Sequence, residues 1–373
     1  MQVTQQTRIL IVGAGPVGLS AAVELRRRGM TPRIIDRDPG PAPESRALAV
    51  NPRTLEILEP SGATDRMLAR GNRIHHMIVR TPERELFRFN TKNLHHRFNF
   101  LLALAQSETE QILAELLGEA GHPVEWQHEL TDLQADGEAF RCAIGPQEEI
   151  FDVVVGADGA HSLVRKSLGI EFTGESLPEA WGLADVELES WPFPWDCGVA
   201  TLSDDYVCAF FPLREGFGRF VSSRADIMDS LPPDARVSKI VWQSEFHISY
   251  RQVETYQQGN AFLAGDAAHI HSPVGGRGMN LGIEDAAWLA YLLCEGRAGE
   301  YTHLRHGPGA QVLKMTSAPT HLLASRSVWA RFLRTVVLPL VFGRPLVQRF
   351  LLSRMAGLDT PAPPWLGHFP SKP

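Results

Sequence analysis

The sequence predicts an α/β fold in which a domain built on a parallel sheet is interrupted by a β-rich insert. Short apolar strands that end in glycine turns and lead into helices occur at the start of the chain, and the same style returns at residues 151–159 and 261–265. Between them, residues 171–256 contain short alternating runs with several tryptophans and prolines, which is typical of an antiparallel or mixed sheet. The strand–turn–helix domain is therefore expected to be discontinuous.

The length, composition and net charge of the chain exclude several classes of protein. A length of 373 residues favours two or three domains at ~150 residues each. Hydrophobic residues make up 44% and charged residues 21%, which excludes a disordered, collagen-like or coiled-coil chain. Lys and Arg number 36 against 43 Asp and Glu, which gives a net charge of −7. We therefore expect no nucleic-acid partner.

The cysteines and the apolar stretches indicate the compartment. Cys142, Cys197, Cys208 and Cys294 form no C-x-x-C pair, so free thiols in a reducing compartment are the simplest interpretation. No secretory signal and no uncharged apolar window of ~20 residues occurs, so we expect a cytoplasmic protein without an integral membrane segment. The stretch VVLPLVF (336–342) is expected to be a packed helix end, with peripheral membrane contact as the alternative. The oligomeric state is not predicted.

The first ordered segment has a strand–helix–strand pattern. RILIVG (8–13) is an apolar run with β-branched residues, and TPRIID (31–36) is a second short strand that ends in an acid. VGLSAAVELRRRG (17–29) lies between them, with small and apolar residues on one face and a glycine at its end. These three elements form the βαβ unit that opens the parallel sheet.

Gly13, Gly15 and Gly18 form a G-x-G-x-x-G motif between that strand and helix. The first glycine allows a tight turn, the second a close approach of a pyrophosphate, and the third the packing of helix on strand. The helix N-terminus supplies free N–H groups for the phosphates. Asp36 ends the second strand roughly 20 residues on, where an acid that binds the adenosine ribose is expected. The motif predicts bound FAD or NAD, and it occurs only once in the sequence.

Three further features lie between the motifs. A helix is expected near Pro52–Leu58, whereas residues 73–100 have a mixed periodicity and are left unassigned. Ser107 and Glu110 form an S-x-x-E capping box, which predicts the start of another helix.

The segment AFLAGDAAHIHSPVGGRGMNLG (261–282) distinguishes between the two dinucleotides. Asp266 directly follows a strand, and its carboxylate can accept hydrogen bonds from sugar-alcohol hydroxyls. The glycines after Pro273 can lie against a flat ring without side-chain collision. The N–H groups of the helix that starts at Asn280 can stabilise negative charge on a ring carbonyl. These features favour a flavin.

Taken in chain order, these motifs and three more carry a resemblance to a known family. The three are Arg46 in ESRAL, Gln106 in LALAQSETEQIL, and Asp158-Gly159 in GADG. From residue 8 to about residue 295 the chain resembles the single-component FAD-dependent aromatic hydroxylases, also called group A flavoprotein monooxygenases, with a para-hydroxybenzoate hydroxylase-like fold. The resemblance implies a Rossmann-like FAD-binding domain of the glutathione reductase type, an inserted β-rich substrate domain and a helical C-terminal region. The expected boundaries are 1–72, 101–170 and 257–295 for the FAD-binding domain, 73–100 and 171–256 for the substrate domain, and 296–373 for the C-terminal region.

The resemblance also implies which residues hold the cofactor. Arg46 would lie near the pyrophosphate and flavin, and Gln106 near the ribityl–phosphate region. Leu130 would contact the adenine through its backbone, Asp158 would lie at the nicotinamide approach, and Asp266 would bind ribityl and pyrophosphate groups. The structural alternatives are a surface Arg46, a Gln106 that only precedes a helix, and an Asp158 that only stabilises the next helix. The full set is Gly13, Gly15, Val17, Gly18, Asp36, Arg37, Arg46, Gln106, Leu130, Asp158, Gly159, Asp266, Pro273, Gly275, Gly276, Gly278, Met279 and Asn280.

The activity implied by the resemblance is the hydroxylation of an aromatic, phenolic small molecule. NADPH or NADH would reduce the FAD, and O2 would then form a flavin C4a-hydroperoxide that transfers one oxygen atom. The alternatives are an epoxidase or a ubiquinone-pathway-type ring hydroxylase with a more apolar substrate, and a flavin-binding protein without turnover. Arg277 stands where a glutamine is common in the family. It is expected either to bind an acidic substrate or a phosphate, or to point to solvent.

Neither a catalytic residue nor a metal site is assigned. Tyr206, His247 and Tyr250 lie in the expected substrate domain, but each is more readily explained as a sheet residue than as the base that deprotonates a phenol. His269 and His271 have the spacing of a metal-binding pair, but no further ligand cluster accompanies them.

Overall fold

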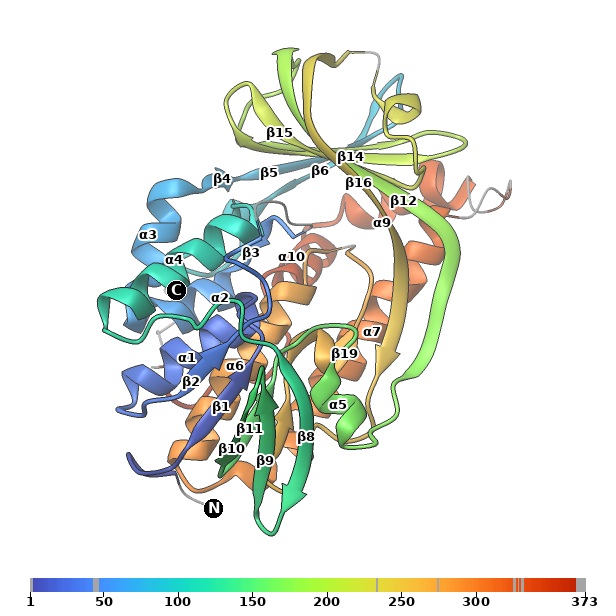
Figure 1. The fold of residues 1–373 in the computed structure, drawn as a ribbon. Coiled ribbons are helices and arrows are strands. Elements are labelled where there is room, and N and C mark those ends of the chain that lie inside the picture. The colour runs from blue at the N-terminus through green and yellow to red at the C-terminus, as the bar shows by residue number, and fades with distance from the viewer. Residues whose placement is uncertain are drawn as a thin grey trace.

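The structure is a computed structural model, and it describes residues 3–42, 47–232, 234–273, 275–324, 327, 329 and 332–366. Figure 1 shows two parts joined by long strands: a parallel sheet with its helices below, and a large sheet above. The fold class predicted from the sequence is confirmed, since a β-rich sheet is inserted into an α/β domain and helices follow it. The domain boundaries given above stay predictions.

A five-stranded sheet lies at the centre of the lower part, in the order β17-β18-β11-β1-β2. All neighbours run parallel except the short edge pair β17 and β18. Every residue of β1, β11 and β18 is buried, as expected for a parallel sheet whose two faces are covered. The strands are β1 (Ile9–Val12), β2 (Arg33–Ile35), β11 (Val153–Gly156), β17 (Gln257–Gln258) and β18 (Ala261–Leu263).

Helix α1 (Pro16–Arg27) packs against α4 (Gln106–Glu119) and α6 (Gly278–Cys294). Helix α4 begins at Gln106, with Ala105 as its N-cap residue and no side-chain cap, so the predicted capping box is wrong. The carboxylate of Glu110 instead accepts a hydrogen bond of 2.8 Å from the Gln106 side-chain amide, one turn earlier. The local S-x-x-E pattern failed because the chain enters the helix one residue before the serine.

An eight-stranded sheet forms the upper part, in the order β19-β16-β12-β15-β14-β13-β5-β6. Strands β12 and β16 are long, pair antiparallel and run down from the upper sheet to the lower part (Figure 1). The last residues of β16 pair with β19, which lies immediately before the glycine-rich loop. The strands are β5 (His76–Arg80), β6 (Glu85–Asn90), β12 (Thr173–Ser190), β13 (Cys197–Leu202), β14 (Val207–Arg214), β15 (Phe217–Ser222), β16 (Arg236–Gln252) and β19 (His269–Ile270).

Two smaller sheets and the remaining short helices complete the part that surrounds the parallel sheet. One sheet is an antiparallel meander, β8 (Leu130–Asp136), β9 (Ala139–Ile144) and β10 (Gln147–Phe151). The other contains β3 (Ala49–Val50), β4 (Asn72–Ile74) and β7 (Leu101–Ala103). The short helices are α2 (Pro52–Leu58), as predicted, α3 (Ala63–Arg70) and α5 (Leu163–Ser167).

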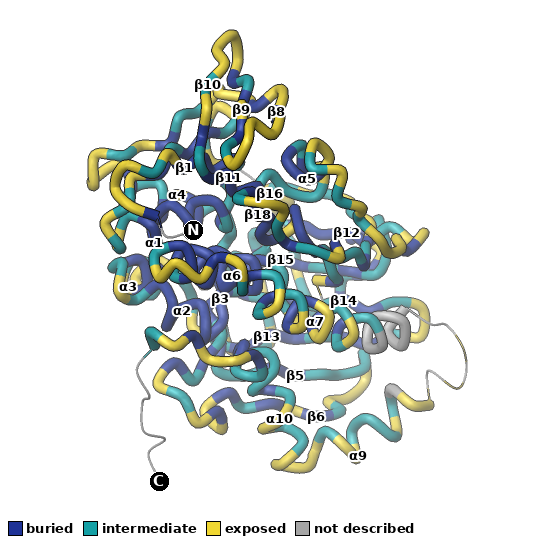
Figure 2. The backbone as a smooth tube through the Cα atoms, turned by 90° about the horizontal axis from the view of Figure 1, so that it is seen from below, coloured by how far each residue is buried: buried dark blue, intermediate teal, exposed yellow. Residues whose placement is uncertain are grey.

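The C-terminal region is helical, as predicted, but its surface is less covered than expected. It comprises α7 (Tyr301–Ala324), a π-helical turn (Leu333–Val337), α9 (Leu338–Phe342) and α10 (Pro345–Met355). Phe342 packs on Phe87 of the upper sheet with ring centroids 5.3 Å apart, whereas Leu340 is 71% exposed. The predicted packed helix end is therefore right for one side only, and Figure 2 shows exposed residues along α9.

Among the described residues, no single helix has the length and apolarity needed to cross a bilayer. The segments Thr335–Phe342 and Pro345–Met355 meet that criterion only as a pair, and they are bent by 91°. Membrane-surface contact by this region stays a prediction.

Candidate functional site

The glycine turn after β1 brings three glycines together, but only one of them borders open space. Gly13 has φ of +99°, and a Cβ there would lie 2.5 Å from the carbonyl oxygen of Ala157. A Cβ at Gly18 would lie 1.9 Å from the carbonyl oxygen of Gly13. No atom lies within 4 Å of a Cβ placed on Gly15, which is also the N-cap residue of α1 and lacks a side-chain cap. The turn therefore leaves room at the helix N-terminus for an anionic group.

A cavity of about 300 Å³ opens from this turn. Residues from the glycine turn, the end of β2, α4, the start of β8 and the end of β11 line it. Seven of the predicted cofactor residues are brought together there, from segments more than 100 residues apart in the sequence. They are Gly13, Gly15, Asp36, Arg37, Leu130, Asp158 and Gly159.

Asp36 ties the end of β2 to the glycine turn. Its carboxylate accepts hydrogen bonds from the backbone N–H of Ala14 at 2.6 Å and of Asp38 at 2.9 Å. Both bonds fix the carboxylate at the lining of the cavity. A hydroxyl pair of a ribose would meet an oriented acceptor here, as the motif predicts.

Glu110 lines the cavity, whereas the sequence predicted that it forms a helix capping box with Ser107. It comes from α4, is buried, and holds the side-chain amide of Gln106. Burial raises the pKa of Glu110, and the negative charge of Asp36 adds to this rise. The same cavity is lined by Trp126, His128 and Glu129, which precede β8 and which no sequence motif marked.

Asp158 has a structural task in addition to its place in the cavity lining. Its carboxylate accepts hydrogen bonds from the Ser162 hydroxyl at 2.5 Å and from the backbone N–H groups of Leu163 at 2.7 Å and Val164 at 3.1 Å. It therefore stabilises the start of α5, which was the structural alternative in the sequence. Burial raises the pKa of Asp158 even though these hydrogen bonds act in the opposite direction.

The glycine-rich loop, residues 273–280, follows β19, and its last three residues form the start of α6; residue 274 lies outside the described residues. Asn280 clamps it: its side-chain amide donates to the carbonyl oxygens of Ala49 and Gly276, both at 2.7 Å. Gly275 and Gly276 have φ of +90° and +62°, in the left-handed region that glycine tolerates best. The loop conformation is thus fixed by one buried side chain and two glycines.

Four further predicted cofactor residues have other or undetermined surroundings. Val17 packs where Cβ atoms of Gly265 and Gly282 would be, at 2.7 and 2.6 Å, so it joins α1 to the start of α6. Met279 is buried in the main core. Asp266 is exposed on a short 3-10 turn (Gly265–Ala267) after β18. Arg46, predicted near the pyrophosphate, lies outside the described residues.

One predicted placement of Arg277, pointing to solvent, is wrong, whereas the other, binding of an acidic substrate or a phosphate, stays a prediction. It is only 1% exposed, so it does not point to solvent. Its guanidinium Nη1 pairs with the Asp359 carboxylate at 2.8 Å and also donates to the carbonyl oxygen of Arg354. Its charge is therefore neutralised inside the protein by a residue from the end of the C-terminal region.

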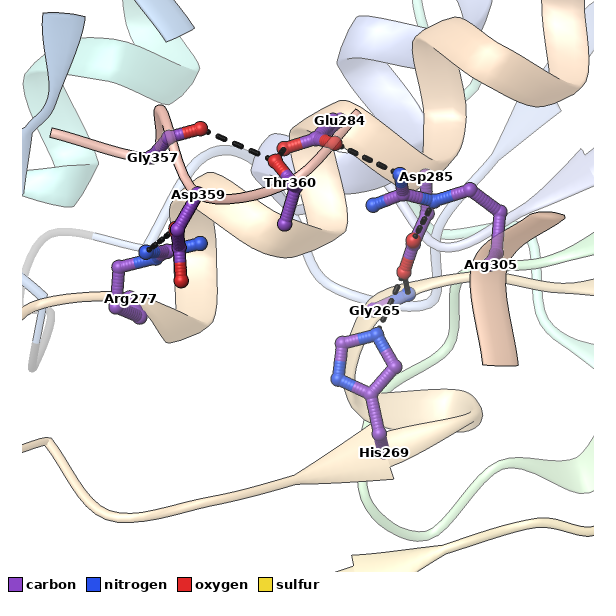
Figure 3. A network of polar contacts seen from close by, with 9 residues as sticks. All are labelled: Gly265, His269, Arg277, Glu284, Asp285, Arg305, Gly357, Asp359 and Thr360. Carbon is purple, nitrogen blue, oxygen red and sulfur yellow. Dashed lines mark hydrogen bonds and ion pairs between the residues drawn. The ribbon is translucent and has the colours of Figure 1, made fainter. Parts of the chain in front are cut away.

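A buried ionic network connects β19, α6 and α7 (Figure 3). The Arg305 guanidinium donates to Asp285 and to Glu284, each at 2.7 Å, and the second oxygen of Asp285 lies 2.6 Å from His269 Nε2. Burial would raise the pKa of Asp285, but Arg305 and His269 lower it below its ordinary value. Among the described residues, no group of three His, Cys, Asp or Glu residues could hold a metal ion.

The three candidate bases are not brought to the cavity at the glycine turn. Tyr250 lines a separate open groove of about 630 Å³, together with Glu175 and Lys314. His247 is exposed on β16, and Tyr206 is half-buried beneath Arg224, where burial raises its pKa. A catalytic base therefore stays unassigned.

The residues present fit a dinucleotide with a flavin ring. The space at Gly15 suits a pyrophosphate, the oriented Asp36 carboxylate suits a ribose, and the N-terminus of α6 lacks a side-chain cap beside the glycine-rich loop. The loop is held by the buried side chains of Arg277 and Asn280.

Comparison with known proteins gives consistent findings. The family described as "FAD binding domain" matches residues 6–221 and 222–305. The chain is 36% identical over 94% of its length to the 6-methylpretetramide 4-monooxygenase of Streptomyces rimosus, of which it covers 69%. The anhydrotetracycline hydroxylase OxyS from Streptomyces rimosus is 29% identical with a TM-score of 0.79, over 97% of this chain and 78% of that one. The p-nitrophenol 4-monooxygenase from Pseudomonas putida shares the fold, with a TM-score of 0.85 at 21% identity, over 96% of this chain and 99% of that one.

Proposed function

The chain belongs to the FAD binding domain family and is an FAD-dependent aromatic monooxygenase, and on this basis we propose that it hydroxylates a phenol with several fused rings. The observation that carries the proposal is the 36% identity, over 94% of the chain, to an enzyme named for 6-methylpretetramide. The similarity to an anhydrotetracycline hydroxylase points to the same kind of substrate. NAD(P)H and O2 are the co-substrates of this family.

The proposed cofactor site uses the residues that converge at the cavity. Gly15 and the N-terminus of α1 would hold the pyrophosphate, Asp36 the adenosine ribose, and the backbone at Leu130 the adenine. The loop 273–280 would lie along the isoalloxazine ring. The chemistry that FAD supplies when bound is electron uptake from NAD(P)H and activation of O2.

The protein's own contribution is positioning and exclusion of water. The uncapped N-terminus of α6 carries a positive dipole end, which would favour negative charge on the ring carbonyl next to the loop. β19 joins the glycine-rich loop to the eight-stranded sheet, and this sheet would shield a substrate bound beside the loop from water. We also propose a cytoplasmic location, which the four free thiols support.

The test compares fused-ring phenols, such as hydroxylated naphthalenes and anthraquinones, with phenol and p-nitrophenol. Bleaching of the enzyme-bound flavin by NADPH or NADH is followed without oxygen, and the products formed in air are identified by mass. We expect fused-ring phenols to accelerate bleaching by about tenfold or more and to gain one oxygen atom. Acceleration and oxygen gain with the single-ring phenols alone would contradict the proposal. Oxygen gain only at an isolated double bond would favour the epoxidase.

A further inference from the structure

We propose that residues 354–360 form part of the cofactor site, because they hold the loop 273–280 in its binding conformation, and that Arg277 is the positioning residue that joins the two. This inference rests on the proposed assignment of that loop to the isoalloxazine ring. The family match ends at residue 305, so residues 354–360 lie outside the part of the chain that the family defines.

The first connection is the buried ion pair between Arg277 and Asp359. The side chains of the two residues are 1% and 10% exposed, and Nη1 of the arginine lies 2.8 Å from a carboxylate oxygen of the aspartate. The other carboxylate oxygen accepts a hydrogen bond of 3.0 Å from the Gln311 side chain. A buried charge left without its partner is strongly unfavourable, so the loop keeps this position only while Asp359 is in place.

The second connection runs through the start of α2. The backbone N–H of Arg53 donates to the carbonyl oxygen of Ala356 at 3.1 Å, and a Cβ at Gly357 would lie 2.9 Å from the Cβ of Arg53. Asn51, two residues before Arg53, donates its backbone N–H to the Asn280 side chain at 2.9 Å. Asn280 also donates to the carbonyl oxygen of Gly276 in the loop. The contacts therefore run in a closed circuit from residues 354–360 through the start of α2 and Asn280 to the loop, and back through Arg277 and Asp359.

The third connection passes through the buried ionic network (Figure 3). The Thr360 hydroxyl lies 3.3 Å from Glu284, which pairs with Arg305. Arg305 in turn pairs with Asp285, whose carboxylate accepts a hydrogen bond of 3.4 Å from the backbone N–H of Gly265. Gly265 precedes Asp266, which is expected to bind the ribityl chain. The 354–360 segment is thus connected to both predicted flavin-binding stretches that follow β18.

The test measures the affinity of the full-length apoprotein for FAD by flavin fluorescence. We expect Arg277→Gln and Asp359→Asn each to weaken FAD binding by about tenfold or more, and the double variant to bind no more weakly than the weaker single variant, because both remove one interaction. At saturating FAD the flavin absorption bands of both variants should be shifted from those of the parent, whereas loss of general stability would leave them unchanged. The matched control is Glu119→Gln, which breaks an exposed pair with Arg66 and should bind FAD like the parent.

Parent-like FAD affinity and absorption in both Arg277→Gln and Asp359→Asn would overturn the inference. If Arg277→Gln does not fold, the FAD affinity is compared in two other variants. Asp359→Asn changes a less buried side chain, and Thr360→Val changes an uncharged one. Failure of the parent apoprotein to bind FAD at all would instead refute the proposed function, so the two failures are distinguishable.

Discussion

The three glycines of the first turn share a motif but differ in what surrounds them. At Gly13 and Gly18 the positions that a Cβ would take are filled by backbone atoms, whereas at Gly15 that position is empty. The motif could be predicted from the sequence. Only the structure shows that two of its glycines pack against backbone atoms and that the third borders open space.

This division predicts opposite outcomes for two matched substitutions. Gly15→Ala should leave the thermal stability of the apoprotein unchanged, because its φ of −69° suits any residue, and should weaken FAD binding by about tenfold or more. Gly18→Ala should destabilise the apoprotein by about 1–3 kcal/mol, since its Cβ would collide with a backbone oxygen. Calorimetry of both apoproteins and an FAD titration of Gly15→Ala check this. Equal loss of stability in the two variants would contradict it.

His271 gives a pH-dependent prediction. Burial lowers its pKa to about 4, and the neighbouring His269 and Arg277 act in the same direction. Because the unfolded chain has a histidine pKa near 6.5, it binds more protons than the folded chain between pH 4 and 6.5. Stability should therefore fall as the pH drops through this window, by roughly 3 kcal/mol from this residue at 1.36 kcal/mol per unit.

The substitution His271→Asn isolates this contribution, since the asparagine amide can replace the ring N–H that faces the Ser272 carbonyl oxygen. Denaturant unfolding of the apoprotein is measured between pH 4 and pH 7 for parent and variant. The difference between the two free energies of unfolding should change by up to about 1.36 kcal/mol per pH unit, which corresponds to the binding of one proton. A difference that is constant with pH would show that His271 is not held neutral.

The buried ion pair of Arg277 could not be predicted from the sequence. Its partner Asp359 lies 82 residues further along the chain, in a segment without a motif. Nothing near Arg277 in the sequence indicates a buried acid, so substrate binding and solvent exposure were the alternatives considered. Only the fold brings the two side chains together.

At the scale of elements, periodic and strongly apolar segments were predicted well. The strands β1, β11 and β18 and the helices α1 and α6 occur where the sequence places them, within a few residues. Residues 73–100 could not be assigned because β5 and β6 belong to the large sheet, in which β5 pairs with β13, about 120 residues away. Such non-local pairing leaves only a weak local pattern.

The start of α5 carries an element-scale prediction. Asp158→Ala removes the acceptor of two backbone N–H groups at this helix N-terminus and should destabilise the apoprotein by about 1–2 kcal/mol. Asp158→Asn keeps one acceptor oxygen and should lose less. The control is Asp132→Ala on the exposed side of β8. Thermal unfolding in the absence of FAD gives the comparison, and an Asp158→Ala variant as stable as the control would contradict this role.

At the scale of the whole molecule, segments far apart in the sequence meet at the cavity, and other distant segments meet at the glycine-rich loop. The glycine turn, the end of β2, α4, β8 and the end of β11 surround the cavity, and Arg277 of the loop 273–280, which does not line that cavity, pairs with Asp359. The resemblance stated from the sequence covered residues 8 to about 295, and the family match covers 6–305. It gave the fold class and the cofactor, but it could not reveal contacts with a C-terminal segment outside it.

The central claim is that this convergence forms a site for one FAD. Calorimetric titration of the apoprotein with FAD, and separately with NADPH, tests it most directly. The account predicts one FAD bound per chain, with affinity reduced in Gly15→Ala and no displacement of FAD by NADPH. Saturable NADPH binding that Gly15→Ala abolishes, with no heat on addition of FAD, would contradict it.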